Sequence, residues 1–411
     1  MTQLLHQHTF ENGLTLLAEE MPWLESAAMA LLVPCGAVHD PHGHLGLCNF
    51  VCDMVQRGSG DLSSREFVQA LERLGVDRSA SVTLSHTSFS AATLAENLIP
   101  ALTLHADLIR RPIFPADQID EARLVCLQEL RASEDDLAHR VIERVRSLQY
   151  PSPWGRSVQG TSDAIGQIGM TDVQRHFETR YQPSGAILSV AGKLDWSQLK
   201  DHVAQLFGDW KANPPEPIKE TPPEEQHAHI QHESNQTHIA ISYPSVPYRD
   251  ENYYQARAAV GVLSDGMSSR LFTEVREKQG LCYTIYAMVN TLRDQGAVFC
   301  YSATSNERAQ ETLDVAMREL KKLKDGVHED ELKRLKARIK SGLIMQQESS
   351  ASRSFSMAID WHHLGRIRPI QEVSDRVNAL TASSISDYLR DNPPRDFHHV
   401  SLGMSPLEMK L

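Results

Sequence analysis

The feature that most constrains the fold is a proline-rich segment that separates two halves of similar order. Residues 211–229 read KANPPEPIKETPPEEQHAH, in which five prolines and many charges interrupt the apolar periodicity. This composition is typical of a linker. The chain has 411 residues, more than the roughly 250–300 at which a single hydrophobic core stops growing. We therefore expect two domains, at 1–210 and 230–411, joined by a linker at 211–229.

The two halves carry strands and helices in a similar order, which indicates an internal duplication. Apolar periodicity predicts the strands and helices of each half. In the first half the expected strands are 14–20, 26–37 and 79–94, and the expected helices are 45–58, 64–75 and 99–111. In the second half the expected strands are 238–246, 282–290 and 298–305, and the expected helices are 253–266 and 310–326.

Two pairs of helical segments support the duplication. Residues around Ile119 resemble those around Leu332 at an offset of 213, and residues around Met170 resemble those around Leu380 at an offset of 210. A chance match between amphipathic helices is the alternative, because such patterns recur widely. Since the elements lack regular βαβ spacing, we expect an α+β fold in which each domain is an antiparallel sheet with helices packed on one face.

Charge and cysteine content exclude several classes of protein. Lys and Arg number 41 against 53 Asp and Glu, a net charge of -12 that argues against binding to nucleic acid or to an anionic membrane surface. Six cysteines are too few for a disulfide scaffold, and most lie in apolar runs, so buried thiols in a reducing compartment are expected. The N-terminus lacks a basic region followed by a cleavage site, and no apolar stretch reaches ~18 residues. We therefore expect a cytoplasmic protein.

One predicted helix has the frame of an inverted zinc motif, H-x-x-E-H, in which two histidines bind the metal and the glutamate acts as general base. The segment from Gly46 resembles the G-L-x-H-F-x-E-H-M-x-x-x-G-[ST] signature of the pitrilysin, insulinase and mitochondrial processing peptidase superfamily. The matching residues are Gly46, Leu47, Phe50, Met54, Gly58 and Ser59. The positions of the metal ligands and the general base differ, because Asn49 and Asp53 replace the two histidines and Cys52 replaces the glutamate.

The resemblance implies a third ligand on a later helix, and its counterpart is Glu129, 76 residues beyond Asp53. Asn49, Asp53 and Glu129 form a hard-oxygen set, which suits zinc poorly and would suit a weakly held calcium or magnesium ion better. Ser79–Val82 also replaces the N-A-x-T that the family carries on the strand that pairs with substrate. We expect a packed, vestigial motif helix and no metal or cofactor in this chain.

The second half retains a further family segment. Asp265–Ala287 resembles the G-M-S-S-R-L-F-x-x-[LV]-R-E-x-x-G-L-x-Y pattern of the family's C-terminal domain almost letter for letter. The resemblance implies that Arg276 and Tyr283 reach the active site, where a phenol stabilises an oxyanion and a guanidinium binds a substrate carbonyl. The alternative is packing: Ser268 or Ser269 would cap a helix and Arg276 would pair with Glu274 or Glu277.

The resemblance implies a non-catalytic subunit of a heterodimeric zinc peptidase. Zinc is then expected in a homologous partner subunit, with Arg276 and Tyr283 completing that active site in trans while both chains enclose an unfolded peptide. One alternative is a non-proteolytic structural or peptide-binding homodimer of the same superfamily. A second is a lone enzyme with an unrecognised metal site.

Histidine groups offer other metal candidates. His39, His42 and His44 lie in a Pro/Gly loop without helical spacing, so solvated loop histidines are the preferred interpretation. His362 and His363 are adjacent in a helical segment and point to different faces, which disfavours joint ligation.

Overall fold

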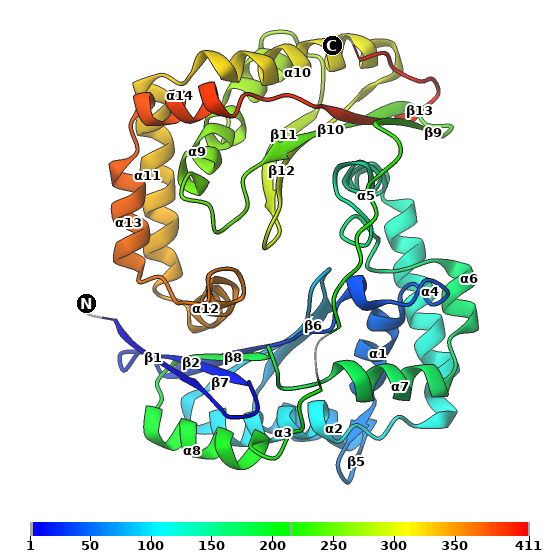
Figure 1. The fold of residues 1–411 in the computed structure, drawn as a ribbon, viewed down its shortest axis with the longest axis vertical. Helices are drawn as coiled ribbons and strands as arrows, with labels where there is room; N and C mark the ends of the chain where they lie inside the picture. Colours follow the sequence, from blue (N-terminus) through cyan, green and yellow to red (C-terminus); the bar gives the residue numbers. More distant parts are fainter. Residues whose placement is uncertain (1–2, 214–215, 410–411) are drawn as a thin grey trace. The chain divides into compact units, whose positions relative to one another are not determined.

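The computed structural model describes residues 3–213 and 216–409, and the chain forms two compact units (Figure 1). Unit 1 contains Met1–Ala132, Arg156–Lys219 and Met345–Arg368. Unit 2 contains Ser133–Gly155, Glu220–Ile344 and Pro369–Leu411. Each unit thus takes one short segment from the half of the chain that mostly builds the other unit, which the boundaries expected at 1–210 and 230–411 do not include. A strand, β9 (His227–Gln231), begins inside the segment expected to be a linker.

Unit 1 is built on a mixed sheet. Its strands, in spatial order, are β1 (Leu4–Thr9), β2 (Thr15–Glu20), β8 (Ile187–Gly192), β3 (Ser26–Val33), β7 (Thr87–Leu94) and β6 (Asp77–Val82). The pair β2 and β8 is parallel, and the other pairs are antiparallel. A small hairpin joins β4 (Gly58–Ser59) to β5 (Leu62–Ser63).

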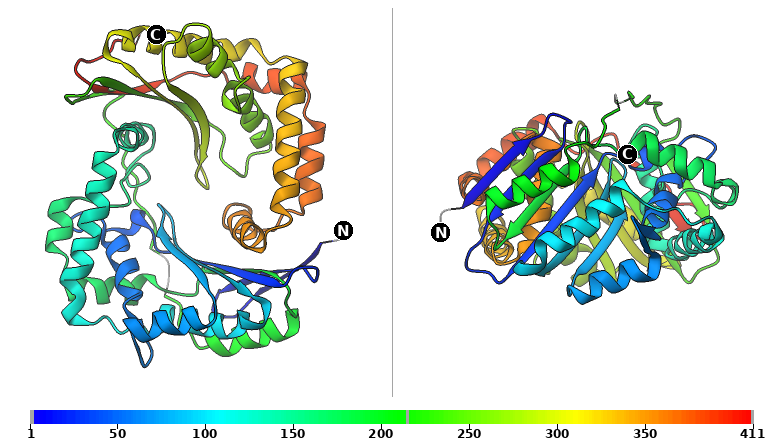
Figure 2. Two further views of the ribbon diagram at one scale, coloured as in Figure 1. Left: turned by 180° about the vertical axis from the view of Figure 1, so that it is seen from behind. Right: turned by 90° about the horizontal axis from the view of Figure 1, so that it is seen from below.

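Strand β3 reads SAAMALLV and is apolar on both sides, so both faces of the unit 1 sheet need to be covered. Met29 and Leu31 belong to the main core, whereas Ala30 and Leu32 pack on the opposite face with Met357 of α12. The view from below shows helices of unit 1 lying against its sheet (Figure 2). The helices of unit 1 are α1 (Leu47–Val55), α2 (Ser64–Arg73), α3 (Leu98–Arg110), α4 (Ile119–Asp135), α6 (Ser162–Gln167), α7 (Met170–Arg180), α8 (Trp196–Phe207) and α12 (Ser350–Leu364), of which α4 runs on into unit 2.

Unit 2 repeats this plan. Its strands, in spatial order, are β11 (Thr284–Thr291), β12 (Gly296–Ser305), β10 (Gln236–Ser245), β13 (His398–Gly403) and β9. The helices are α5 (Leu137–Gln149), α9 (Tyr253–Ser264), α10 (Ala309–Lys322), α11 (Glu329–Gln346), α13 (Ile370–Ala379) and α14 (Ala382–Asp391), and α11 runs on into unit 1. Helices α9, α10, α11 and α14 contribute to the core on one face of the sheet, and α5 packs on the other through Val141 and Val145.

The strand order confirms the internal duplication. The order β2-β8-β3-β7-β6 in unit 1 corresponds to β9-β13-β10-β12-β11 in unit 2. In both, the first pair is parallel and the next three pairs are antiparallel. The predicted α+β class is confirmed, with two additions: each sheet contains one parallel pair, and a single helix from the other half of the chain covers its second face.

A buried histidine of α3 makes the fold sensitive to acid. His105 is 3% exposed, and burial lowers the pKa of its imidazole to about 4, with a further contribution from Arg78. The unfolded side chain has a pKa of about 6.5, so the neutral, buried His105 costs no stability above that pH. The free energy of unfolding then falls as the pH drops from about 6.5 towards 4, by up to about 3 kcal/mol. Urea unfolding across this range should give a shallower pH dependence for His105→Leu and an unchanged one for the exposed His8→Gln. An unchanged slope in His105→Leu would contradict this assignment.

Candidate functional site

Helix α1 presents its motif positions on a different face from its core residues. Its apolar residues and both of its cysteines are buried, whereas Asn49 and Asp53 are half-buried. The helix begins at Gly46, whose φ of 93° is in the left-handed region. The Asp40 carboxylate accepts hydrogen bonds from the backbone N–H of Gly46 at 2.7 Å and of Cys48 at 2.8 Å. This carboxylate therefore fixes the first turn of α1 by satisfying its free donors.

The structure brings together two of the three positions that the resemblance aligns with the family's metal ligands. Asn49 Nδ2 donates a hydrogen bond to Glu129 Oε2 at 2.8 Å, whereas Asp53 Oδ2 is paired with Arg57 Nε one turn later at 2.6 Å. The opposite orientation of the Asn49 amide would set two oxygens 2.8 Å apart, which is repulsive. These side chains therefore bind one another and Arg57.

Cys52, at the position of the general base, is ill suited to that role. Its side chain is 4% exposed. Burial raises the pKa of its thiol far above the ordinary value, and the nearby charges of Cys35, Asp53 and Glu129 add to the shift. A general base works best with a pKa near the operating pH. The Cys52 thiol thus remains protonated at neutral pH and has no tendency to take a proton from water.

Arg276 and Tyr283 lie against each other in unit 2. Arg276 belongs to a π-helical turn, Phe272–Glu277, and its guanidinium carbon lies 4.8 Å from the ring centroid of Phe272 and 5.2 Å from that of Tyr283. Both distances are within cation–π range. Tyr283 is 79% exposed. The two rings hold the guanidinium in place while the Tyr283 phenol faces solvent.

The packing alternative for this segment does not match the contacts. Glu274 is paired with Lys278 at 2.7 Å, and among the described residues no carboxylate lies within ion-pair distance of Arg276. The hydroxyl of Ser269 is buried without a hydrogen-bond partner, and no side chain caps the π-helical turn. Neither contact expected from a purely structural Arg276 or a capping serine is formed.

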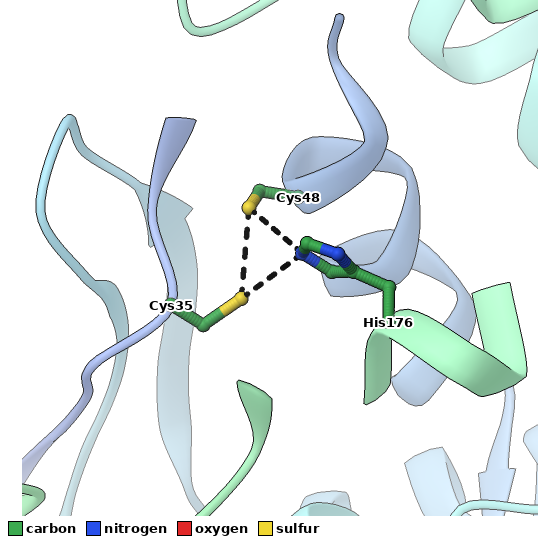
Figure 3. Close-up of side chains that lie close together, drawn as sticks. All are labelled: Cys35, Cys48 and His176. Carbon is green, nitrogen blue, oxygen red and sulfur yellow. Dashed lines mark hydrogen bonds between the residues drawn. The ribbon is translucent and has the colours of Figure 1, made fainter. Parts of the chain in front are cut away.

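A second cluster lies on the core side of α1. Cys35, which follows β3, Cys48 of α1 and His176 of α7 converge in unit 1 (Figure 3). The Sγ of Cys35 lies 3.5 Å from the Sγ of Cys48 and 3.5 Å from Nε2 of His176, and Cys48 Sγ lies 3.1 Å from the same Nε2. All three side chains are buried. Two thiols and an imidazole are the donor types that soft and borderline metals prefer.

The two thiols of this cluster differ in acidity. The contact with Cys48 lowers the pKa of Cys35 to about 6 against the opposing effect of burial, and His176 adds to the lowering. Burial and the neighbouring Cys35 raise the pKa of Cys48. Cys35 is therefore the sulfur that carries negative charge first.

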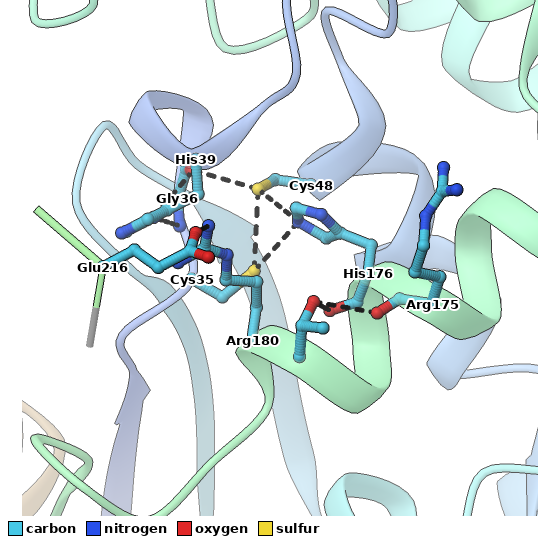
Figure 4. Close-up of polar contacts among 9 residues, drawn as sticks. Cys35, Gly36, His39, Cys48, Arg175, His176, Arg180 and Glu216 are labelled. Carbon is cyan, nitrogen blue, oxygen red and sulfur yellow. Dashed lines mark hydrogen bonds and ion pairs between the residues drawn. The ribbon is translucent and has the colours of Figure 1, made fainter. Parts of the chain in front are cut away.

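Further polar contacts surround the cluster (Figure 4). Cys48 Sγ donates to the Gly36 carbonyl oxygen at 2.9 Å, and Thr87 Oγ1 donates to the carbonyl oxygen of Cys35. A Cβ on Gly36 would lie 2.5 Å from the backbone of the loop at residues 84–86, so this approach requires glycine. Burial, followed by the Arg180 charge, lowers the pKa of His39 to about 4, while Arg180 itself is paired with Glu216.

Gly160 approaches the start of α1 closely, and we expect its replacement to be costly. A Cβ on Gly160 would lie 2.1 Å from the carbonyl oxygen of Leu45, and the φ of Gly160 is 79°. Gly160→Ala should therefore lower the free energy of unfolding by about 2 kcal/mol or more. In the control Gly166→Ala, in α6, the added Cβ meets nothing within 4 Å and should stabilise by about 0.5–1 kcal/mol. Urea titrations of both variants test this, and equal midpoints would contradict it.

The sequence missed the cluster of Cys35, Cys48 and His176 because its members are 13, 128 and 141 residues apart. No local spacing marks such a set, and Cys48 occupies the unspecified position of the motif helix. All six cysteines are free and buried, as expected. The other histidine candidates have separate partners: His39 contacts Gly36, His44 faces Asp172 at 3.6 Å, and His362 contacts Ser85. None of the described helices is long and apolar enough to cross a membrane.

Comparison with known proteins agrees with the duplicated fold. Residues 15–162 match the family model "Insulinase (Peptidase family M16)", and residues 167–339 match "Peptidase M16 inactive domain". An uncharacterised zinc protease of Rickettsia felis is 26% identical over 91% of this chain and 92% of its own length. One of Bacillus subtilis is 25% identical over 96% of this chain and 97% of its own.

Solved structures show the same fold over the whole chain. A peptidase M16 inactive domain from Pseudomonas fluorescens superposes with a TM-score of 0.87 at 20% identity, covering 99% of this chain and all of that one. A protease from Helicobacter pylori gives a TM-score of 0.90 at 20% identity, covering 98% of this chain and all of its own. The two family models, which together span residues 15–162 and 167–339, identify the chain as a member of peptidase family M16, and the solved structures agree in fold.

Proposed function

We propose that this chain is a non-catalytic M16 subunit that pairs with a homologous, zinc-bearing peptidase chain and lends it Arg276 and Tyr283. One contrast carries the proposal. The former zinc positions are occupied by internal contacts, namely the hydrogen bond from Asn49 to Glu129 and the ion pair of Asp53 with Arg57. The Arg276 and Tyr283 pair, by comparison, stays available, with the Tyr283 ring 79% exposed.

The motif helix argues against hydrolysis by this chain alone. A catalytic zinc site keeps three protein ligands and one open position for water. An amide that donates to Glu129 and a carboxylate held by Arg57 do not supply such a set, and the raised pKa of the Cys52 thiol leaves no general base at that position. Because relatives are named zinc proteases, an independent peptidase is the rival function. The cleavage assay described below distinguishes it from a non-catalytic subunit.

The Arg276 and Tyr283 pair adjoins a strand edge that can receive a peptide. Tyr283 directly precedes β11, which is at the edge of the unit 2 sheet and pairs with β12 within the described residues. An extended peptide can add to such an edge through main-chain hydrogen bonds. A phenol and a guanidinium at the start of the strand would then lie near the peptide's carbonyl groups. This arrangement favours an unfolded peptide over a folded protein as substrate.

The buried, reduced cysteines support a reducing compartment, and the proposal places the subunit in the cytoplasm. The zinc partner would be a chain of similar length with an intact H-x-x-E-H motif, and a gene next to the one for this chain is the first place to look for it.

The test is peptide cleavage by the purified chain, by that partner and by their mixture. We expect turnover only from the mixture, together with a heterodimer in size-exclusion chromatography. Cleavage by this chain alone, with one zinc bound at Glu129, would overturn the proposal. A stable homodimer that binds peptide and leaves the partner's activity unchanged would instead support the non-proteolytic alternative.

A further inference from the structure

The cluster of Cys35, Cys48 and His176 has the donor set and the spacing of a metal site. A tetrahedral zinc ion with Zn–S of about 2.3 Å and Zn–N of about 2.0–2.1 Å separates two sulfurs by about 3.8 Å and a sulfur from a nitrogen by about 3.6 Å. The corresponding distances are 3.5 Å between the sulfurs, and 3.5 and 3.1 Å from the sulfurs to Nε2 of His176. The three atoms thus approximate one face of a tetrahedron, with deviations of about 0.1–0.5 Å from the ideal separations.

Packing in the core does not by itself call for these residues. Cys35 and Cys48 belong to the main hydrophobic core of unit 1, most of whose other members are aliphatic or aromatic. In the part of the chain that the structure describes, the His176 ring has only these two sulfur atoms as hydrogen-bond partners. Sulfur is a weak partner, and a buried polar ring without strong partners is costly. Among residues 3–213 and 216–409, no other group of three or more metal-binding side chains converges in this way.

We propose that Cys35, Cys48 and His176 form a structural zinc site in unit 1. Binding would release the two thiol protons to solvent, so that two thiolates and a neutral imidazole balance the charge of Zn²⁺. A neutral complex is the least costly one to bury, which favours Zn²⁺ over Cu⁺, since Cu⁺ with two thiolates would leave a net negative charge. Sulfur and nitrogen donors disfavour Ca²⁺ and Mg²⁺.

The fourth position points to a role in structure and against a role in hydrolysis. The Gly36 carbonyl oxygen accepts the Cys48 S–H at 2.9 Å and the backbone N–H of His39 at 2.8 Å, and ionisation of the thiol would leave one of its lone pairs for the ion. All three side chains are shielded from solvent, so no open position faces a substrate. The ion would join the end of β3, the first turn of α1 and the middle of α7. It would lie on the core side of α1, away from Asn49 and Glu129, and is independent of the proposed trans function.

Metal content and cobalt spectroscopy of the full-length chain test the site. The chain is expressed in minimal medium supplied with zinc or with cobalt, so that the buried site is filled during folding, and is purified without chelator. We expect close to one zinc per chain. The cobalt-grown protein should show the visible bands of tetrahedral cobalt and thiolate-to-cobalt charge transfer in the near ultraviolet. Substoichiometric metal and no thiolate band in the wild-type chain would overturn the proposal, whatever the variants do.

Variants locate the ion. Cys48→Ala and His176→Gln should each lose the zinc and the thiolate band, whereas Cys126→Ala, which removes another buried thiol, and Glu129→Gln should keep both. Circular dichroism checks that each variant is folded. Zinc retained in Cys48→Ala and lost in Glu129→Gln would place the metal at the motif positions and refute the Cys35, Cys48 and His176 site.

Discussion

Replacing Tyr283 by phenylalanine is expected to lower kcat/KM of the mixed peptidase by about 10²–10³-fold, if the phenol stabilises the oxyanion that forms during peptide hydrolysis. The substitution removes one hydroxyl and keeps the ring that holds Arg276. Since the lost hydrogen bond forms fully only in the transition state, kcat should fall more than KM rises. Rates are measured with saturating amounts of this chain, so that weaker pairing of the subunits does not imitate a catalytic defect.

The matched control is Tyr286→Phe, which removes a phenol hydroxyl three residues later, from within β11. Tyr286 packs on Tyr301, with ring centroids 5.3 Å apart, and is half-buried. We expect its loss to leave kcat/KM within about twofold, because its hydroxyl does not adjoin Arg276. Equal rates for Tyr283→Phe and the wild type in the mixture would refute the proposed role of the phenol.

Arg276→Lys separates charge from geometry at the same place. Lysine keeps the positive charge but lacks the planar fork that stacks between Phe272 and Tyr283 and binds a carbonyl with two N–H groups. A large loss in Arg276→Lys would therefore show that the stacked guanidinium matters. If Arg276→Lys kept most of the activity, the positive charge alone would be sufficient for the role of Arg276.

Much of the fold could be predicted, because the apolar periodicity of a strand or helix is visible in its own local sequence. The apolar run expected at 26–37 contains β3, and the stretch expected at 79–94 contains β7 and most of β6. The exchange of α5 and α12 could not be predicted in this way. An amphipathic helix must bury one face, but its sequence does not say which sheet will receive it, and the face that accepts α5 is built from strands that lie far along the chain.

The candidate sites show the same difference between what local sequence patterns reveal and what depends on contacts between distant segments. The positions of Asn49 and Glu129 came from the family resemblance, and the structure joins them by a 2.8 Å hydrogen bond. The cluster of Cys35, Cys48 and His176 depends on the register of three elements and has no sequence signature. The expectation of no metal in this chain was drawn from the motif helix, and it contained no information about the core behind that helix.

The largest loss of stability is expected from Arg353→Met, which breaks a buried ion pair between α12 and β2. Arg353 Nε lies 2.6 Å from Glu19 Oε2, and both side chains are 3% exposed. Removing the guanidinium leaves a buried carboxylate whose remaining described partner is Gln3, so the free energy of unfolding should fall by about 3–5 kcal/mol. Four of the five tryptophans lie in unit 1, so tryptophan fluorescence during urea unfolding follows the affected unit.

Two comparisons give this prediction its meaning. The double variant Glu19→Leu/Arg353→Met should recover most of the loss, because a buried ion pair contributes little beyond a well-packed apolar pair, whereas an unpaired buried charge is very costly. The exposed pair of Arg390 with Asp387 supplies the control, since Arg390→Met should cost at most about 1 kcal/mol. If Arg353→Met were no more harmful than Arg390→Met, α12 would not be anchored on the sheet of unit 1 by this contact. The position of α12 would then depend on the apolar packing around Met357 and on the hydrogen bonds of Ser350 with Ser26 and of His362 with Ser85.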